Sequence, residues 1–338
     1  MTRLNRRQAL KYGGAASIAT FSGLSGCLGR DAEGDYPSED ITLISNYPEG
    51  SATFSLAHQT ASIITEQQGV NVEVEAIGGA SGLRGLGELT NRSNDGYTFS
   101  TGYTPSQPLA ELINPPGFTV NDLTGIVDAG HYTFNLIADP EQEFESFEDI
   151  RDRYNDGEYD TIGGLGFGHS WHVACAIARE VIDGGWDWSN FVTFDGSNDS
   201  VRGTAAGEVP VSTASTGPAV AEVEAGNIDA FANFYSEGDE FAPMIPAWVD
   251  DLGLPDIDYI GVISYFFAAP PELDDGLRSE AADMFTEAIE SDEMQDWADE
   301  SRRHHYVDHR EEEVNEMFVE VQETIPELVD LDAIIQED

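Results

Sequence analysis

Short apolar stretches alternate with longer amphipathic ones along most of the chain. The run Ile41 to Ile44 predicts a buried strand, and the two-residue alternation of Val70 to Ile77 predicts a half-buried strand. Between these runs, apolar residues from Ser55 to Glu66 recur at helical spacing. Strands that alternate with helices are typical of parallel βαβ units, so the sequence predicts an α/β fold.

The same alternation continues into the second half of the chain. Tyr159 to Ile162 predicts a strand, Ser170 to Val181 a helix, and Asn190 to Phe194 a further strand. Nearer the C-terminus, one long amphipathic helix is predicted over Arg278 to Arg302 and a last helix over Val314 to Leu328.

Three loops rich in glycine, serine and threonine each lie between a predicted strand and a predicted helix. They are Tyr47 to Thr53, Gly78 to Gly82 and Gly163 to Ser170. Such loops place backbone N–H groups and positive helix N-termini at the carboxyl ends of the strands, which suits an anion. Glycine-rich turns also form for steric reasons alone, so the loops by themselves leave the presence of a ligand open.

The charge balance of the chain is strongly acidic. The 338 residues contain 15 Lys+Arg and 64 Asp+Glu, for a formal net charge of −49, and the only lysine is Lys11. The part after Cys27 holds 11 arginines and all 64 acids, which gives −53. Such a surface repels a phosphate backbone, so nucleic acid is excluded as a main partner. Acids spread throughout the part after Cys27 resemble the composition of proteins from extreme halophiles such as haloarchaea, in which salt screens the repulsion between the acids.

The first 27 residues have the pattern of an export signal. Arg6 and Arg7 precede the uncharged stretch Tyr12 to Gly26, which is shorter than the roughly 20 residues of a membrane-spanning helix. The paired arginines predict a twin-arginine-type signal peptide over residues 1–27, and Leu24-Ser25-Gly26-Cys27 resembles a lipobox. We therefore expect export, lipidation of Cys27, a tether over residues 28–35, and anchoring at the outer face of the cytoplasmic membrane.

Six segments, taken in chain order, carry a family resemblance. They are Tyr36-Pro37-Ser38 with the strand after it, Tyr47-Pro48-Glu49-Gly50-Ser51-Ala52-Thr53, Gly79-Ala80-Ser81-Gly82 with Gly85, Asp95-Gly96-Tyr97-Thr98, Gly166-Phe167-Gly168-His169-Ser170-Trp171-His172, and Phe194-Asp195-Gly196-Ser197 with Gly207-Glu208-Val209. From about Tyr36 to Leu328, this order and spacing resemble the solute-binding proteins of tripartite tricarboxylate transporters.

The resemblance implies a two-lobed, periplasmic-binding-protein-like (type II) α/β fold with crossing hinge strands. Residues 36–132 and 236–338 would form lobe 1, and residues 133–235 would form lobe 2. The implied function is that of an extracytoplasmic receptor, which captures a small organic anion, a carboxylate, and delivers it to the membrane permease subunits. A receptor of this kind does no chemistry and needs no cofactor or metal.

The resemblance also implies which residues hold the ligand. Neutral hydroxyl and N–H groups suit a carboxylate because they stabilise negative charge without attracting the protein's own acids. Carried over onto this sequence, the ligand residues are Tyr47, Ser51, Thr53, Ser81, Gly82, Thr104, Gly168, His169, Ser170 and Ser215.

Two departures from the family pattern bear on the ligand. Phe167 and His169 stand where the family commonly has Asn and Ser. Ala214 stands nearest the place of an Asp that often holds an amino group of the ligand. The absence of that Asp favours an anion without an ammonium group.

An enzyme is the main alternative from another functional class. Gly168-His169-Ser170-Trp171 looks like the start of a G-x-S-x-G nucleophile elbow, but His172 replaces the last glycine. A surface-anchored serine hydrolase would use Ser170 with an Asp and one of His304, His305 or His309. Otherwise Ser170 is a helix N-cap, which is compatible with ligand contact. A receptor of another transporter class with the same fold, and a receptor coupled to sensing, are further alternatives.

The segment His304 to His309 contains three histidines and one aspartate, which are metal-ligand types. Tyr306 and Val307 within it look like a strand just before the last helix. This pattern favours structural or solvent-facing histidines over a metal site.

Cys175 lies on an apolar helix face, which favours a buried side chain over a nucleophile.

Arginine is rare in this chain, and Arg84, Arg92 and Arg202 are the candidates to pair with a ligand carboxylate. The competing expectation is that each of these arginines pairs with one of the many acids.

Overall fold

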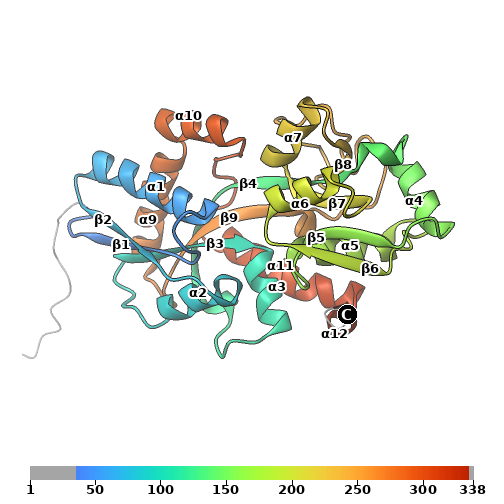
Figure 1. Cartoon of the computed structure of the whole chain (residues 1–338). Helices are drawn as coiled ribbons and strands as arrows, with labels where there is room; N and C mark the ends of the chain where they lie inside the picture. Colours follow the sequence, from blue (N-terminus) through green and yellow to red (C-terminus); the bar gives the residue numbers. More distant parts are fainter. Residues whose placement is uncertain (1–35, 335–338) are drawn as a thin grey trace, which may run out of the picture. The chain divides into compact units, whose positions relative to one another are not determined.

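The computed structural model describes residues 36–334 (Figure 1). The predicted signal peptide, the lipidation site Cys27 and the tether lie outside the described residues, as does the chain from residue 335 on. Between residues 36 and 334, no helix has both the length and the apolar character needed to cross a membrane.

Nine strands form one mixed sheet in the described part of the chain. Their order is β2-β1-β3-β9-β4-β7-β5-β6, and β8 pairs with β4 off this path. The strands are β1 (Ile41–Ser45), β2 (Val72–Ala76), β3 (Thr98–Thr104), β4 (Thr124–Ala138), β5 (Thr161–Leu165), β6 (Asn190–Phe194), β7 (Val211–Ser215), β8 (Asp229–Asn233) and β9 (Val262–Ala269).

Helices connect and cover these strands. The α-helices are α1 (Ala52–Gln68), α2 (Leu83–Leu89), α3 (Ser106–Ile113), α4 (Phe147–Asn155), α5 (Ser170–Val181), α6 (Ser197–Ala205), α7 (Thr216–Glu224), α8 (Asp258–Gly261), α9 (Asp275–Ile289), α10 (Asp292–Ser301), α11 (Glu312–Leu328) and α12 (Leu331–Ile334). Three short 3-10 turns, η1 (Ala80–Gly82), η2 (Val120–Asp122) and η3 (Pro140–Gln142), complete the connections.

Parallel strand pairs lie in the two outer parts of the sheet, and antiparallel pairs lie in its middle. β1 is parallel to β2 and β3, and β5 is parallel to β6 and β7. β9 is antiparallel to β3 and β4, and β4 is antiparallel to β7 and β8. Because helices link the parallel strands, the predicted α/β fold is confirmed.

The longest strand, β4, belongs to both parts of the sheet. Its residues Thr124–Thr133 pair with β9, and its residues Phe134–Ala138 pair with β7. Figure 1 shows β4 and β9 running side by side between the strands β1–β3 and the strands β5–β8. The change of partner falls beside the predicted limit between residues 132 and 133, while the lobe limits themselves stay a prediction.

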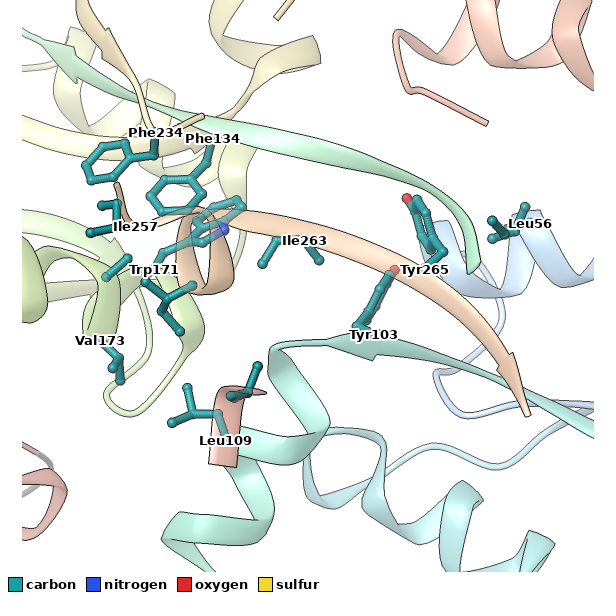
Figure 2. Packing of buried hydrophobic residues seen from close by; sticks show 14 of the residues in the cluster. Leu56, Tyr103, Leu109, Phe134, Trp171, Val173, Phe234, Ile257, Ile263 and Tyr265 are labelled. Atoms are coloured by element: carbon teal, nitrogen blue, oxygen red, sulfur yellow. The ribbon is translucent and has the colours of Figure 1, made fainter. Parts of the chain in front are cut away.

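An aromatic stack ties the second part of the sheet to the start of α5. The Phe134 ring lies 4.4 Å from that of Phe234 and 5.0 Å from that of Trp171, centroid to centroid. All three side chains are buried, and Figure 2 shows them gathered where β4 enters this part of the sheet. Stacked buried rings of this size contribute strongly to stability, so the stack fixes α5 against β4.

One predicted helix is two helices in the structure. The expected helix from Arg278 to Arg302 is wrong, because α9 ends at Ile289 and α10 begins at Asp292. Ser291 separates them, since its Oγ accepts from the Met294 N–H at 3.2 Å as an N-cap. A serine N-cap satisfies a free N–H group and thereby starts a new helix. The helix predicted over Ser170 to Val181 is confirmed as α5.

The segment between α10 and α11 lies against β4 and is not the predicted strand at Tyr306 and Val307. An isolated antiparallel bridge joins His304 to His131, with N···O distances of 3.1 and 2.9 Å. Gly130 makes room for this bridge, because its φ is 81° and a Cβ there would lie 1.8 Å from the His304 carbonyl oxygen. Only glycine fits this position.

Candidate ligand-binding site

The parallel strands place several helix N-termini at their carboxyl ends. α1, η1 with α2, and α3 follow β1, β2 and β3, respectively. In the other part of the sheet, α5, α6 and α7 follow β5, β6 and β7. Ligands of open α/β sheets bind at such strand ends, where helix N-termini carry partial positive charge.

The first turns of these helices differ from the first turns of other helices in the chain. α1, α2, α3, α5 and α7 have no acid in the first turn. In contrast, α4, α9, α10 and α11 each have one or two acids there, the position at which acids stabilise a helix. α6 has Asp199, which pairs with Arg202. The helices at the strand ends therefore keep the positive potential of their N-termini available.

Tyr47, Ser51 and Thr53 come together at the start of α1. Ser51 is the N-cap, and its Oγ accepts from the Phe54 N–H at 3.1 Å. Thr53 is buried, and its hydroxyl donates to the Tyr103 hydroxyl. The Tyr47 ring lies 5.3 Å from the Tyr103 ring. This end of the site is thus lined by neutral hydroxyl groups.

Ser81 and Gly82 join the same group of residues. The Tyr47 hydroxyl and the Gln107 Nε2 both donate to the Ser81 carbonyl oxygen, each at 3.1 Å. Gly82 has φ of 91°, and a Cβ there would lie 2.5 Å from the Gln107 Nε2 and 3.1 Å from the Asn46 Nδ2. Glycine is therefore required where the turn approaches these amides.

The sequence interpretation missed three residues that complete this region. Tyr103 and Gln107 hold Thr53, Tyr47 and the Ser81 carbonyl by hydrogen bonds and ring contact. Asn46 is fully buried, and its Nδ2 has no hydrogen-bond partner among the described residues. A polar residue directly before the loop at Tyr47 was the one available signal for Asn46. Tyr103 lies in β3 and Gln107 in α3, and the sequence around them has no distinguishing pattern.

Thr104 lies on the other face of its strand. Successive side chains of a strand point to opposite faces, so Thr104 faces away from the side of Tyr103. It borders a cavity of about 290 Å³ that is also lined by His131, Tyr235 and Asp128. The structure does not bring Thr104 together with the residues at the start of α1.

At the start of α5, the N-cap is His169 and not Ser170. The His169 Nδ1 accepts from the Trp171 N–H at 3.3 Å, which makes Ser170 the first helical residue. The expected N-cap role of Ser170 is therefore wrong. The imidazole nitrogen of His169 accepts the hydrogen bond that the side-chain oxygen of a Ser, Thr, Asp or Asn residue usually accepts at an N-cap. Histidine is not among the preferred N-cap residues, so the sequence did not indicate this role.

Ser170 is 1% exposed, and its Oγ lies 3.4 Å from the His169 Nδ1. Burial lowers the pKa of His169 to about 4, so its imidazole is neutral near pH 7. The Gly168 N–H donates to the Nδ1 of His172 at 3.2 Å. Burial, together with the charge of Arg179, lowers the pKa of His172 to about 4 as well. Gly168, His169 and Ser170 thus form one neutral cluster at the N-terminus of α5.

Ser215 is held at the start of the neighbouring helices. Its backbone N–H and its Oγ both contact the Ser197 Oγ, at 3.2 and 3.1 Å. Ser215 is the last residue of β7 and precedes α7, while Ser197 begins α6. The two serines therefore link the N-termini of α6 and α7. Ala214, beside them, is buried in β7.

The three C-terminal histidines, one of which a hydrolase would use, are all engaged by other groups. Their ring nitrogens contact the Asp239 carboxylate (His304, 3.2 Å), the Ala129 carbonyl oxygen (His305, 2.9 Å) and the Asp128 carboxylate (His309, 2.9 Å). No group of three His, Cys, Asp or Glu residues within 36–334 is arranged to hold a metal ion. These contacts favour structural roles for the histidines.

Cys175 is fully buried, as expected from its apolar helix face, and burial raises the pKa of its thiol.

Arg92 pairs with Glu75 and Glu88, and Arg202 pairs with Asp199. Two of the three arginine candidates are thus occupied by acids of the protein.

Several known proteins resemble this chain, including BugT, a TctC solute-binding protein and MatC. BugT of Bordetella pertussis is 23% identical over 246 residues, which are 71% of this chain and 74% of that protein. The crystal structure of a TctC solute-binding protein from Polaromonas has a TM-score of 0.74 at 18% identity, covering 87% of this chain and 98% of that one. MatC from Rhodopseudomonas palustris, solved with bound malate, has a TM-score of 0.67 at 17% identity, covering 87% and 100%. These likenesses confirm the periplasmic-binding-protein-like α/β fold.

A protein family matches most of the sequence. Residues 56–314 match the family described as TctC, tripartite tricarboxylate transporter family receptor. The matched stretch contains β3, β4, β9 and the whole of α5 with Ser170. The chain therefore belongs to the TctC family of tripartite tricarboxylate transporter receptors.

Proposed function

We propose that this protein is an extracytoplasmic receptor that captures a small carboxylate for a tripartite tricarboxylate-type transporter. The observation that carries the proposal is the absence of acids from the first turns of α1, α2, α3, α5 and α7. In a chain with 64 acids, these N-termini keep their positive potential available for an anion. Family membership supports the proposal, as does the malate bound by MatC.

The ligand would bind to neutral groups in both predicted lobes. In lobe 1 these are the residues at the start of α1 and η1, and in lobe 2 the cluster of Gly168, His169 and Ser170 with Ser215. Thr104 faces away from Tyr103, so we leave it out of the contact set. Closure of the lobes over the ligand would present one defined surface to the membrane permease subunits. The proposal contains no catalytic step.

The location proposed for the receptor is the outer face of the cytoplasmic membrane. It rests on the twin-arginine-type signal and on Cys27, which would carry the lipid. One lipid chain alone binds a membrane only reversibly, so stable anchoring of a lipoprotein requires more than one acyl chain on that cysteine.

The proposal is tested by calorimetric titration of the purified protein, at molar salt, with a panel of mono-, di- and tricarboxylates. We expect saturable binding of at least one carboxylate and no hydrolysis of simple esters. Ester turnover without carboxylate binding would instead identify a hydrolase.

A further inference from the structure

The two edges of the sheet differ in charge. The strand order begins with β2 on one side and ends with β6 on the other. β2 has the sequence VEVEA, so Glu73 and Glu75 place acids along its edge. β6 has the sequence NFVTF and carries no charged residue, in a chain with 64 acids. Charged side chains on an edge strand hinder pairing with another chain, and β6 lacks this protection.

Apolar side chains are exposed along β6. Val192 in this strand is 37% exposed. Phe167, in the loop after β5, is 42% exposed, and its ring lies 5.7 Å from the half-buried ring of Phe191. Phe167 and Val192 are two of the five large hydrophobic side chains that are exposed in the described part of the chain. Apolar surface thus gathers at the uncharged edge, which is typical of a surface that another chain covers.

The backbone of β6 has hydrogen-bonding groups on its outer side. The Asn190 N–H donates to the carbonyl oxygen of Asp160, just before β5, at 2.9 Å. Backbone groups of successive residues in a strand point to opposite sides, so the N–H and C=O groups of Phe191 and Thr193 point away from β5. Among the described residues, β6 pairs with β5 alone. The outward groups can therefore pair with a further strand.

A second copy of β6 matches this edge in antiparallel orientation. With a two-fold axis at Val192, Phe191 lies opposite Thr193 of the second copy, and each outward N–H meets an outward C=O. The two Val192 residues then form a non-hydrogen-bonded pair, in which side chains approach most closely. On the other face of the sheet, each Phe191 lies opposite a β-branched threonine, a favourable cross-strand pair.

The acids beside β6 are compatible with this register. Asp187 and Asp195 lie on either side of the strand. Continued outward, the register places Asp195 opposite Ser189 of the second copy and Asp187 opposite Ser197. Each of these acids therefore faces a serine rather than another acid. Pairing of β6 with β2 of another copy would instead place two glutamates at the contact and would build an open chain of molecules.

We propose that the protein forms a symmetric dimer in which the β6 strands of two copies pair antiparallel about Val192. The pairing joins the two sheets into one and covers the exposed apolar side chains at this edge. It uses the edge of a strand and not the strand ends, so the inference is independent of the proposed carboxylate binding. A single strand pair is a small interface, so the dimer should dissociate at about micromolar concentrations.

The test measures the mass of the purified protein by sedimentation velocity at molar potassium chloride, over about 1–100 μM protein. Molar salt screens the repulsion between two acidic molecules. We expect the wild type to change from monomer to dimer within this range. Val192→Glu brings two carboxylates together at the axis, and Thr193→Pro removes an outward N–H. Each should weaken dimerisation at least about tenfold.

Ala76→Glu is the matched control for Val192→Glu. It adds the same charge at an exposed position of β2, on the opposite edge of the sheet, and should leave the dimer unchanged. Circular dichroism checks that each variant is folded.

A second experiment tests the register and requires no loss of association. Val192→Cys should form a disulfide-linked dimer with diamide as the oxidant, because the Cα atoms of a non-hydrogen-bonded pair are about 4.5 Å apart, which suits a disulfide. Asn190→Cys is its control, since Asn190 is also exposed in β6. In the proposed register its two copies lie about 13 Å apart along the strands, which is too far for a disulfide.

A wild type that stays monomeric up to about 100 μM at molar salt overturns the inference and leaves the edge to a different partner. So does a dimer that Val192→Glu weakens no more than Ala76→Glu does. Equal cross-linking of the two cysteine variants contradicts the antiparallel register about Val192.

Discussion

At the scale of single residues, we propose that Ser170 contacts the ligand at the N-terminus of α5. It is buried at the first position of the helix, and the His169 imidazole beside it is neutral near pH 7. A hydrogen bond to a charged group contributes about 1.5–3 kcal/mol, so Ser170→Ala should weaken carboxylate binding about ten- to a hundredfold. Titration calorimetry measures this change.

Ser62→Ala is the control for Ser170→Ala, because Ser62 is exposed in the middle of α1. It should leave the affinity unchanged. Ser170→Ala with wild-type affinity would remove Ser170 from the site. Loss of ester turnover with intact binding would point to the hydrolase alternative.

Asp239 is the second residue for which we make a prediction, which concerns the pH dependence of stability. Its carboxylate is buried and accepts hydrogen bonds from Thr133 (2.6 Å), Thr216 (2.8 Å) and the Phe241 N–H (2.9 Å), and it contacts His304. Burial alone would raise the pKa of Asp239, but these bonds outweigh it and lower the pKa to about 2.

A carboxyl group whose pKa is lower in the folded state stabilises the fold above its unfolded pKa. This contribution, about 2 kcal/mol, is present above roughly pH 4 and is lost as the pH falls from 4 towards 2. Asp239→Asn should therefore lower the free energy of unfolding at pH 7 by about 2 kcal/mol and should flatten its pH dependence between 4 and 2. Denaturant unfolding at fixed salt measures both. Parallel pH profiles of wild type and variant would contradict the assignment.

At the scale of elements, an acid added to the acid-free first turn of α1 should not lower the stability of the protein but should weaken its carboxylate binding. Ala52 is the first residue of α1. Ala52→Asp adds an acid that the helix dipole favours, so stability should be unchanged or rise by about 0.5 kcal/mol. The same charge should repel a carboxylate bound at this end by about 1–3 kcal/mol, which weakens binding at least about fivefold.

Asp292→Ala in the first turn of α10 provides the counterpart to Ala52→Asp. It removes an acid from a helix N-terminus outside the proposed site, so stability should fall by about 0.5 kcal/mol while binding stays unchanged. Equal carboxylate affinity of Ala52→Asp and wild type would show that α1 does not hold the ligand.

At the scale of the whole molecule, charge repulsion decides how stability depends on salt. The chain after Cys27 carries 64 acids and 11 arginines, so most carboxylates have no cation beside them. The screening length falls from about 10 Å at 0.1 M salt to about 3 Å at 1 M. The melting temperature should therefore rise steeply with potassium chloride up to molar concentration. The rise should be smaller at pH 4, where many carboxyl groups are protonated, and a flat profile at pH 7 would contradict the prediction.

The membrane anchor is also a property of the whole molecule and remains a proposal. Cys27→Ser should release the protein from the membrane fraction or leave its precursor unprocessed. Fractionation of cells, with the mature size checked by mass spectrometry, measures the outcome. Membrane retention of a Cys27→Ser protein with normal mature size would exclude a lipid on this cysteine.

The sequence by itself determined the α/β class, the approximate positions of the strands β1, β2, β5 and β6 and of the helices α1, α5 and α11, and the three glycine-rich loops. These features are local, because hydrophobic periodicity distinguishes helix from strand and glycine marks the turns between them. Helix α5 was predicted with its observed bounds, Ser170 to Val181. The family was recognised from short motifs in the sequence, and the chain belongs to that family.

Only the tertiary structure decided which residues meet. The bridge between His131 and His304 joins segments that are more than a hundred residues apart in the sequence. Two further differences are local and were missed by the periodicity: strand alternation turns Thr104 away from Tyr103, and the capping serine Ser291 divides the predicted C-terminal helix. Periodicity describes the faces of each element but carries no information on strand order and register, which decide such contacts between distant segments.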